Sequence, residues 1–205
     1  MTAAGPRVLV SCGEASGDAY AAALVAALRE RAPAVEVMGF GGPKLAAAGA
    51  TLAGTFDGMS VTGLTEALAV VRRSWQMLGR IEAMARERRP DVFVAIDFPD
   101  FNFRLLPRMR ALGIPVVYYI SPQLWAWRSG RMATVKRYVD RMLTIFPFEA
   151  SLYEQAGVPV TFVGHPLIEL ARPSATRDAF LASAGLDPSG RVVALLPGSR
   201  KNEVH

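Results

Sequence analysis

Short runs of β-branched and other apolar residues alternate along the chain with longer stretches in which apolar residues recur every three or four positions. The short runs are typical of buried strands, and the longer stretches are typical of helices packed on a sheet. We expect strands over residues 7–12, 35–40, 92–97, 116–120, 141–146 and 160–163. We expect helices near residues 18–31, 63–88, 101–111, 130–139 and 149–156. The pattern predicts an α/β fold with a doubly wound, mostly parallel sheet covered on both faces.

The last part of the chain is predicted to belong to a different unit. Residues 192–196 have the pattern of another strand, and a Pro-Gly-Ser-Arg turn follows it at residues 197–200. We therefore expect a Rossmann-like lobe over residues 1–170 and a connecting segment over 171–191, with a short helix near 176–184. Residues 192–205 would be the first strand and turn of a second lobe that is largely missing. Since such a lobe would form the other wall of a cleft, we expect the chain alone to be inactive.

Composition favours a cytoplasmic protein with an anionic partner. No apolar run reaches the roughly 18 residues of a membrane span, and the N-terminus lacks a signal sequence. The net charge of +5 suits a nucleic acid, an anionic membrane or a phosphorylated substrate. Many arginines gather in the predicted helix over 63–88 instead of alternating with aromatic residues along strands, which disfavours nucleic acid. The single cysteine, Cys12, ends a strand and is expected to be a small buried residue.

Several predicted strands end in residues that suit a ligand site, because ligands of open α/β sheets collect at the carboxyl ends of the strands. The first such loop consists of small residues around Glu14, Ser16, Gly17 and Asp18, and it lacks the spacing of a dinucleotide or P-loop motif. Ser16 or Asp18 could simply cap the next helix. The carboxylate of Glu14 is more than a cap requires, so we retain all four as candidate substrate-binding residues.

Asp97 is the candidate catalytic residue. It follows a buried strand directly, where partial desolvation would adapt its carboxylate to act as a general base. Asp100, after Pro99, is expected to cap the following helix. The two histidines, His165 and His205, are too few and too far apart for a zinc site, so we expect no metal and no cofactor.

Two later strand ends add further candidates. The segment after residue 120 contains Gln123, Trp125, Trp127 and Arg128, which could pack in the core or form a platform for a sugar or an acyl chain. We favour the platform. His165, between Gly164 and Pro166, is either a structural histidine or part of a loop at the same edge of the sheet.

Six segments together carry a family resemblance. In chain order they are GEASGD, DFPDFN, YYISPQLWAWR, FPFE, FVGHPL and LLPGSR. This set, which covers nearly the whole chain, resembles the lipid-A-disaccharide synthases. The resemblance implies a membrane-peripheral GT-B glycosyltransferase with two Rossmann lobes. Such an enzyme transfers 2,3-diacylglucosamine from UDP-2,3-diacylglucosamine to 2,3-diacylglucosamine 1-phosphate, releasing UDP and inverting the anomeric centre without a metal.

The resemblance also implies roles for individual residues. Asp97 would deprotonate the 6-hydroxyl of the acceptor, and Asn102 lies in the same DFPDFN segment. Arg200 would neutralise diphosphate or acceptor phosphate charge, and residues 14–18 match the first loop of the family. The N-terminal lobe would hold the acceptor. Another GT-B enzyme of sugar nucleotides and a non-catalytic acyl-sugar or membrane-surface binding module remain the alternatives, and homo-oligomerisation stays open.

The predicted helix over 63–88 is the candidate membrane surface. Apolar residues recur along it at steps of three and four, with most arginines off the stripe. The stripe consists of Leu64, Leu68, Val71, Trp75, Leu78 and Ile81, and Val61, Val70, Met77 and Met84 widen it. The helix either packs on the sheet or docks on a bilayer that supplies the acylated acceptor. We expect docking, with the protein peripheral on the cytoplasmic face of the inner membrane.

Overall fold

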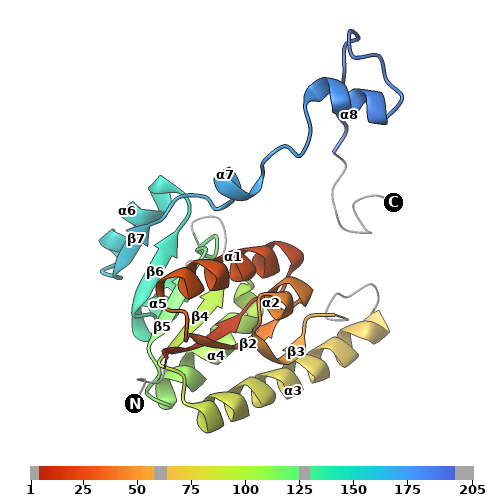
Figure 1. Ribbon diagram of the computed structural model, residues 1–205. Helices are drawn as coiled ribbons and strands as arrows, with labels where there is room; N and C mark the ends of the chain where they lie inside the picture. The colour runs from red at the N-terminus through yellow and green to blue at the C-terminus, as the bar shows by residue number, and fades with distance from the viewer. Residues whose placement is uncertain (1–4, 58–63, 125–129, 197–205) are drawn as a thin grey trace. The chain divides into compact units, whose positions relative to one another are not determined.

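The protein contains one seven-stranded parallel sheet (Figure 1). The computed structural model describes residues 5–57, 64–124 and 130–196, and side chains within α3 only from Val70 onward. The strand order is β3-β2-β1-β4-β5-β6-β7, and every neighbouring pair is parallel. The strands are β1 Arg7–Ser11, β2 Glu36–Gly41, β3 Thr51–Thr55, β4 Val92–Ile96, β5 Val116–Tyr119, β6 Arg141–Thr144 and β7 Val160–Phe162. The sheet confirms the predicted α/β class.

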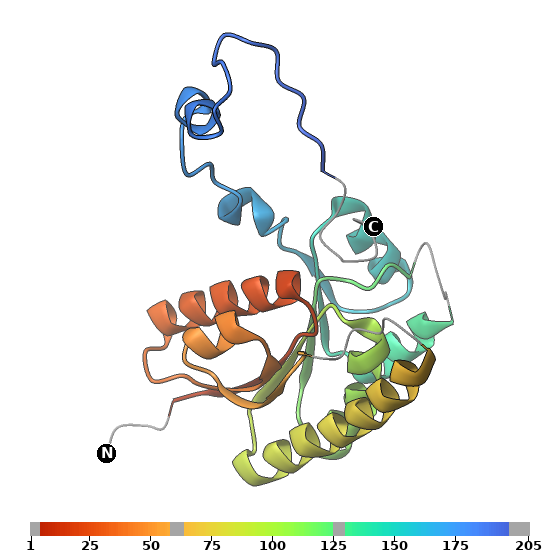
Figure 2. The ribbon, with the colours of Figure 1, turned by 90° about the vertical axis from the view of Figure 1, so that its right-hand side faces the viewer.

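Helices cover both faces of the sheet, as Figure 2 shows for α1 and α2 on one side and α3 on the other. The helices that pack with the sheet are α1 Ala15–Arg31, α2 Pro43–Ala47, α3 Leu64–Arg88, α4 Pro99–Ala111, α5 Arg131–Tyr138 and α6 Pro147–Gln155. Side chains of α1 and α2 form one buried cluster with the sheet, and side chains of α3 to α6 form a larger cluster with it. Two separate cores therefore fix the sheet from its two sides.

The order of the strands reverses between β1 and β4. From β1 the chain passes outward to β2 and β3, and then returns to add β4, β5, β6 and β7 on the other side of β1. Ligands of open α/β sheets bind in the crevice at such a switch point, outside the carboxyl ends of the strands. The loop after β1 and Asp97 after β4 both lie at this point.

The sequence pattern missed α2 and β3. Helix α2 has only five residues, and β3, with the sequence Thr-Leu-Ala-Gly-Thr, lacks the β-branched apolar run of a central strand. Strand β3 lies at the edge of the sheet, where less burial is required. The pairing of the neighbouring strand β2 with β1 depends on Gly39, whose backbone has φ of 149°. A Cβ atom there would lie 1.8 Å from the main-chain oxygen of Val10, so only glycine lets β1 approach this closely.

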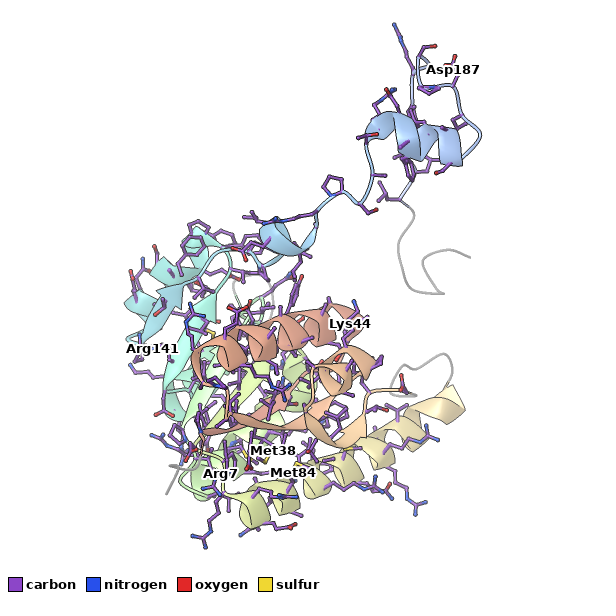
Figure 3. All side chains as sticks on the ribbon, viewed as in Figure 1. Arg7, Met38, Lys44, Met84, Arg141 and Asp187 are labelled. Carbon is purple, nitrogen blue, oxygen red and sulfur yellow. The ribbon has the colours of Figure 1, made fainter. Side chains whose placement is uncertain are left out.

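Helix α3 is a sheet-packed helix over its second half, which corrects the expectation of a continuous membrane-facing stripe. Leu78 and Ile81 are fully buried, and Met77 packs against the same core. Met84 of α3 and Met38 of β2 belong to this cluster as well (Figure 3). Val71 and Trp75, by contrast, are 49% and 51% exposed. Among the side chains described, Val71 and Trp75 thus leave apolar surface open, while the later turns of the helix bury it.

The described residues fall into two compact units, one that ends at Pro166 and a second that begins at Leu167. The second unit contains α7 Leu167–Leu170 and α8 Arg177–Ser183, whose N-terminus is capped by the side chain of Thr176. Residues 192–196, predicted as a strand, have no regular structure and are exposed. Because a strand is stable only when its backbone pairs with a neighbour, its apolar pattern alone does not produce one. None of the described helices could cross a bilayer as a hydrophobic span.

Candidate active site

A cleft of about 330 Å³ opens at the carboxyl ends of β4, β5 and β6. Its polar lining includes Asp97, which follows β4, and Gln123, which belongs to the loop after β5. The first turns of α4, α5 and α6 contribute Asp100, Arg131 and Glu149. The remaining lining residues are Pro99, Ile120, Ser121, Pro122, Leu124, Ile145 and Phe146. The cleft therefore combines one apolar wall with carboxylate, amide and guanidinium groups.

Asp97 sits in a strained turn at the rim of this cleft. Asp97 and Phe98 have φ of 44° and 48°, so two successive non-glycine residues adopt the left-handed conformation. Such residues cost of order 1–3 kcal/mol each unless the surroundings enforce them. The ring of Phe98 lies against Gly13, where a Cβ atom would come within 2.2 Å of it. The close approach of the two loops thus depends on a glycine after β1.

Buried hydrogen bonds hold this turn. The main-chain oxygen of Asp97 accepts one bond from Asn102 Nδ2, at 2.7 Å, and another from the hydroxyl of Tyr118, at 2.8 Å. Asn102 Oδ1 accepts a bond of 2.7 Å from Ser11 Oγ, which ties the turn to β1. Burial and the nearby Asp97 raise the pKa of Tyr118 well above its usual value, so its hydroxyl remains a donor. Asn102 is fully buried, so we assign it to holding Asp97 rather than to contacting substrate.

The carboxyl group of Asp97 is more basic than an ordinary aspartate. Its pKa is raised from 3.8, mainly because burial disfavours the charged form and also because Glu14 places a second negative charge nearby. A hydrogen bond from the main chain of Phe98 partly opposes this shift. Tyr20 of α1 also responds to Asp97, whose charge adds to the effect of burial in raising its pKa. A carboxylate with a raised pKa can take a proton from an alcohol more readily, which is the chemistry of a general base.

The first loop divides into buried and exposed residues. The carboxylate of Asp18 is almost completely buried and accepts bonds from the main-chain N–H groups of Gly42, Lys44 and Leu45, at 2.8, 2.9 and 3.0 Å. Asp18 therefore stabilises the start of α2, and of the two alternatives its carboxylate does not take the one of capping its own helix. Glu14 occupies the N-cap position of α1 without a side-chain cap bond. Glu14 and Ser16 are exposed, whereas Gly17 is buried.

Cys12, also in this loop, is buried as expected. Burial, together with the charge of Asp18, raises the pKa of its thiol to about 12. The thiol therefore stays protonated at neutral pH and is a poor nucleophile.

Asp100 does not cap α4, contrary to the sequence-based expectation. The N-cap residue is Phe98, and Asp100 lies in the first turn, where its carboxylate forms an ion pair with the guanidinium of Arg131. Arg131 also lies over the ring of Phe103, with 4.9 Å between the guanidinium carbon and the ring centre. The pair joins the starts of α4 and α5. Because Asp100 is largely exposed, the pair itself contributes only about 0–1 kcal/mol.

The other candidate residues differ in where they lie. Gln123 is exposed and lines the cleft with Asp97. His165 is half-buried between the rings of Phe146 and Tyr20, with ring centres 5.6 and 6.4 Å away, so it belongs to the same edge of the sheet. Trp125, Trp127, Arg128 and Arg200 lie outside the described residues.

In the ranges that the structure describes, no three His, Cys, Asp or Glu side chains gather into a possible metal site.

Sequence reasoning did not select two charged residues of the cleft, Glu149 and Arg131. Glu149 accepts a hydrogen bond of 3.3 Å from the main-chain N–H of Phe146. Ser121, at one of the strand ends expected to form the site, shares a hydrogen bond of 2.8 Å with the hydroxyl of Tyr153. The available signal was positional, because first turns of helices that follow parallel strands face the carboxyl edge of the sheet. Residues at helix starts after each strand would have included both Arg131 and Glu149.

Sequence comparison now identifies the family. A model of the lipid-A-disaccharide synthetase family matches residues 8–205. The chain belongs to this family. It is 49% identical over 199 residues to the lipid-A-disaccharide synthase of Myxococcus xanthus, covering 97% of this chain and 52% of that protein. The synthase of Geobacter sulfurreducens is 46% identical over 201 residues, with the same coverage of both chains. The chain spans about half the length of the curated relatives it matches.

Solved structures of other proteins show the same fold. Acinetobacter baumannii MurG matches with a TM-score of 0.52 and 15% identity, covering 83% of this chain and 47% of that one. Glycyrrhiza uralensis UGT73P12 matches with a TM-score of 0.53 and 10% identity, covering 83% of this chain and 50% of that one. These likenesses establish a Rossmann-like lobe of the GT-B type, in agreement with the expected fold.

The titration of Asp97 can be measured directly. Because burial and Glu14 both raise its pKa, the carboxyl carbon of Asp97 should titrate above the usual value of 3.8 in carbon NMR spectra of the folded chain. Glu14→Gln removes one negative charge and should move this titration to lower pH. Glu30→Gln, on the exposed C-terminal turn of α1, is the matched control and should leave it unchanged.

The same shift predicts the sign of a stability effect. The folded protein holds the Asp97 proton more tightly than the unfolded chain, so the free energy of unfolding should fall as pH rises through the folded pKa. Asp97→Asn, which tolerates the left-handed backbone, should therefore be at least as stable as the wild type at pH 7. If the carboxyl group of Asp97 titrated at or below pH 3.8, the assignment of a raised pKa to Asp97 would be wrong.

Proposed function

We propose that this chain forms the acceptor-binding half of a lipid-A-disaccharide synthase. The proposed reaction transfers 2,3-diacylglucosamine from UDP-2,3-diacylglucosamine to 2,3-diacylglucosamine 1-phosphate and releases UDP. Family membership supports the reaction class. The observation that carries the proposal is Asp97, whose carboxyl group lines the cleft at the switch point and has a raised pKa.

In the proposed mechanism Asp97 acts as the general base. Its carboxylate accepts the proton of the acceptor 6-hydroxyl while that oxygen forms a bond to the anomeric carbon of the donor. The bond from this carbon to the UDP oxygen breaks, and UDP leaves with the electron pair. Because the acceptor oxygen attacks the face opposite UDP, the anomeric configuration is inverted. Glu14 keeps the pKa of Asp97 high, which strengthens the base. Asn102 and Tyr118 fix the turn that places it.

The apolar wall of the cleft suits the acylated acceptor. Phe146, which is 41% exposed, lines the same space as Asp97, beside the nearly buried Ile120, Leu124 and Ile145. An acyl chain that covers Phe146 would remove apolar surface from water. An acceptor with two acyl chains must come from a bilayer. The protein is accordingly proposed to be cytoplasmic and peripheral, on the inner-membrane face where this lipid would be supplied.

We assign the membrane contact to the exposed part of α3 and its arginine neighbours. Val71 and Trp75 leave apolar surface open, and the guanidinium groups of Arg104 and Arg108 lie 5.2 and 5.8 Å from the Trp75 ring centre. Arginines near an anionic bilayer contribute about 1 kcal/mol each, an attraction that salt weakens. Leu78 and Ile81 are excluded from this contact because they are in the core.

The proposed activity can be tested in a full-length chimera. This chain would be joined to the part of the Myxococcus xanthus synthase that it does not cover, and product would be measured by mass spectrometry. We expect the disaccharide 1-phosphate and UDP in equal amounts. Asp97→Asn should lower kcat by roughly 10²–10⁴-fold, because a general base is lost while the fold is kept. Asp57→Asn, on an exposed loop after β3, is the control and should retain activity.

Two outcomes would contradict this proposal. A folded wild-type chimera that forms no disaccharide would favour a non-catalytic lobe that binds acyl sugars. Near wild-type turnover in Asp97→Asn would remove Asp97 from the mechanism.

The membrane contact predicts a selective loss of vesicle binding. Replacing Val71 and Trp75 with Ser should lower binding of the chain to anionic vesicles several-fold, because exposed apolar surface is lost, and should leave the circular dichroism spectrum unchanged. Raising the salt concentration should weaken wild-type binding. Phe162→Ser, at an exposed apolar position on β7, is the control. If the double variant sedimented with vesicles as the wild type does, the proposed membrane contact of α3 would be wrong.

A further inference from the structure

The charged groups of the cleft are unequally available to a ligand. Among the described residues that line it, three are carboxylates, namely Asp97, Asp100 and Glu149, and Arg131 is the one cation. Glu149 is buried and accepts a hydrogen bond from the main-chain N–H of Phe146. Asp97 is the proposed base. An anionic group that enters the described part of the cleft would therefore bind at Arg131.

Arg131 is presented in a manner that suits an anion. It is the first residue of α5, and its side chain is only 24% exposed. The ring of Phe103 supports one face of the guanidinium, which leaves the edge with its N–H donors for a partner. Gly130, at the N-cap of α5, provides no side-chain cap. The N–H groups and the dipole of this first turn add to the positive potential around Arg131.

The present partner of Arg131 is an oxyanion. Asp100 pairs with the guanidinium, but its own side chain is 72% exposed, so solvent competes for it. A phosphate monoester carries more charge than a carboxylate and can accept two parallel bonds from a guanidinium. Phosphate can therefore displace Asp100 from Arg131 without any change in the fold.

We propose that Arg131 binds the 1-phosphate of the acceptor and that Asp100 occupies this position when no acceptor is bound. The assignment rests on the proposed function and adds a specificity-determining residue to it. In the acceptor sugar, C1 with its phosphate and C5 with its CH2OH group both adjoin the ring oxygen, so the 6-hydroxyl and the 1-phosphate lie near enough to enter one cleft together. Asp97 at the end of β4 and Arg131 at the start of α5 come from different elements that line one cleft, as such a ligand requires.

The test measures binding of two lipids to the 205-residue chain. One is 2,3-diacylglucosamine 1-phosphate and the other is the same lipid without phosphate, each in neutral detergent micelles, with binding followed by calorimetry. The wild type should bind the phosphorylated lipid at least 10-fold more tightly. Arg131→Gln should lose this preference and still bind the unphosphorylated lipid with wild-type affinity. Asp100→Asn should increase the preference several-fold, because the competing carboxylate charge is removed.

Further variants separate Arg131 from general charge and from folding. Arg137→Gln makes the same change on α5 outside the cleft lining and should keep the full preference. Arg131→Lys keeps the charge without the planar pair of donors and should retain only part of it. Circular dichroism checks that each variant is folded. Inorganic phosphate titrated alone should bind at least 100-fold more weakly than the lipid.

The outcomes distinguish this inference from the proposed function. If Arg131→Gln keeps the full wild-type preference for the phosphorylated lipid, the assignment of Arg131 is wrong and the proposed function still stands. Inorganic phosphate that binds as tightly as the lipid would make this a site for free phosphate and would also overturn the assignment. Failure of the wild type to bind either lipid would contradict the proposed function itself.

Discussion

The geometry of the candidate site depends on one main-chain oxygen, that of Asp97. It accepts bonds from Asn102 in α4 and Tyr118 in β5, and Asn102 is tied to Ser11 at the end of β1. Three strands and one helix are thereby joined at the switch point of the sheet. Buried side-chain networks of this kind fix one conformation because each member would be left unsatisfied in any other. The strained left-handed turn at Asp97 persists because these bonds enforce it.

The stability that the turn at Asp97 costs is consistent with a functional site. Two successive left-handed residues and a carboxyl group with a raised pKa both lower stability at neutral pH. A fold optimised only for stability would place a glycine or an asparagine at such a turn. Retaining an aspartate there, with Glu14 close enough to raise its pKa further, favours a role in proton transfer.

The sequence was sufficient to predict the central strands and the position of Asp97. Their apolar runs are long enough to be recognised, and parallel strands bring their carboxyl ends to one edge. It was not sufficient to predict the direction in which polar side chains near that edge point. Asp18 and Asn102 lie in the motifs that suggested a site, but both are buried and satisfy backbone or side-chain groups of other elements. The partner of Asp18 is α2, a helix that the pattern itself did not predict.

Arg131 and α3 show two further limits of prediction from the sequence. The local sequence marks Arg131 only by its place at the start of a predicted helix, because its relation to Asp97 arises only when β5 and α5 take their places in the fold. The periodicity of α3 gave the helix correctly but could not assign its apolar residues to the core or to a membrane. Burial separates them, with Leu78 in the core and Trp75 at the surface.

The central claim, that the network around the main-chain oxygen of Asp97 places the catalytic base, is tested most directly by kcat of Tyr118→Phe in the full-length chimera. This change removes one hydroxyl from a buried ring that otherwise keeps its packing, at a stability cost of about 0.5–1.5 kcal/mol. Because small displacements of a catalytic group lower rates steeply, we predict a fall in kcat of about 10-fold or more, with KM unchanged. A folded Tyr118→Phe variant with wild-type kcat would contradict the account.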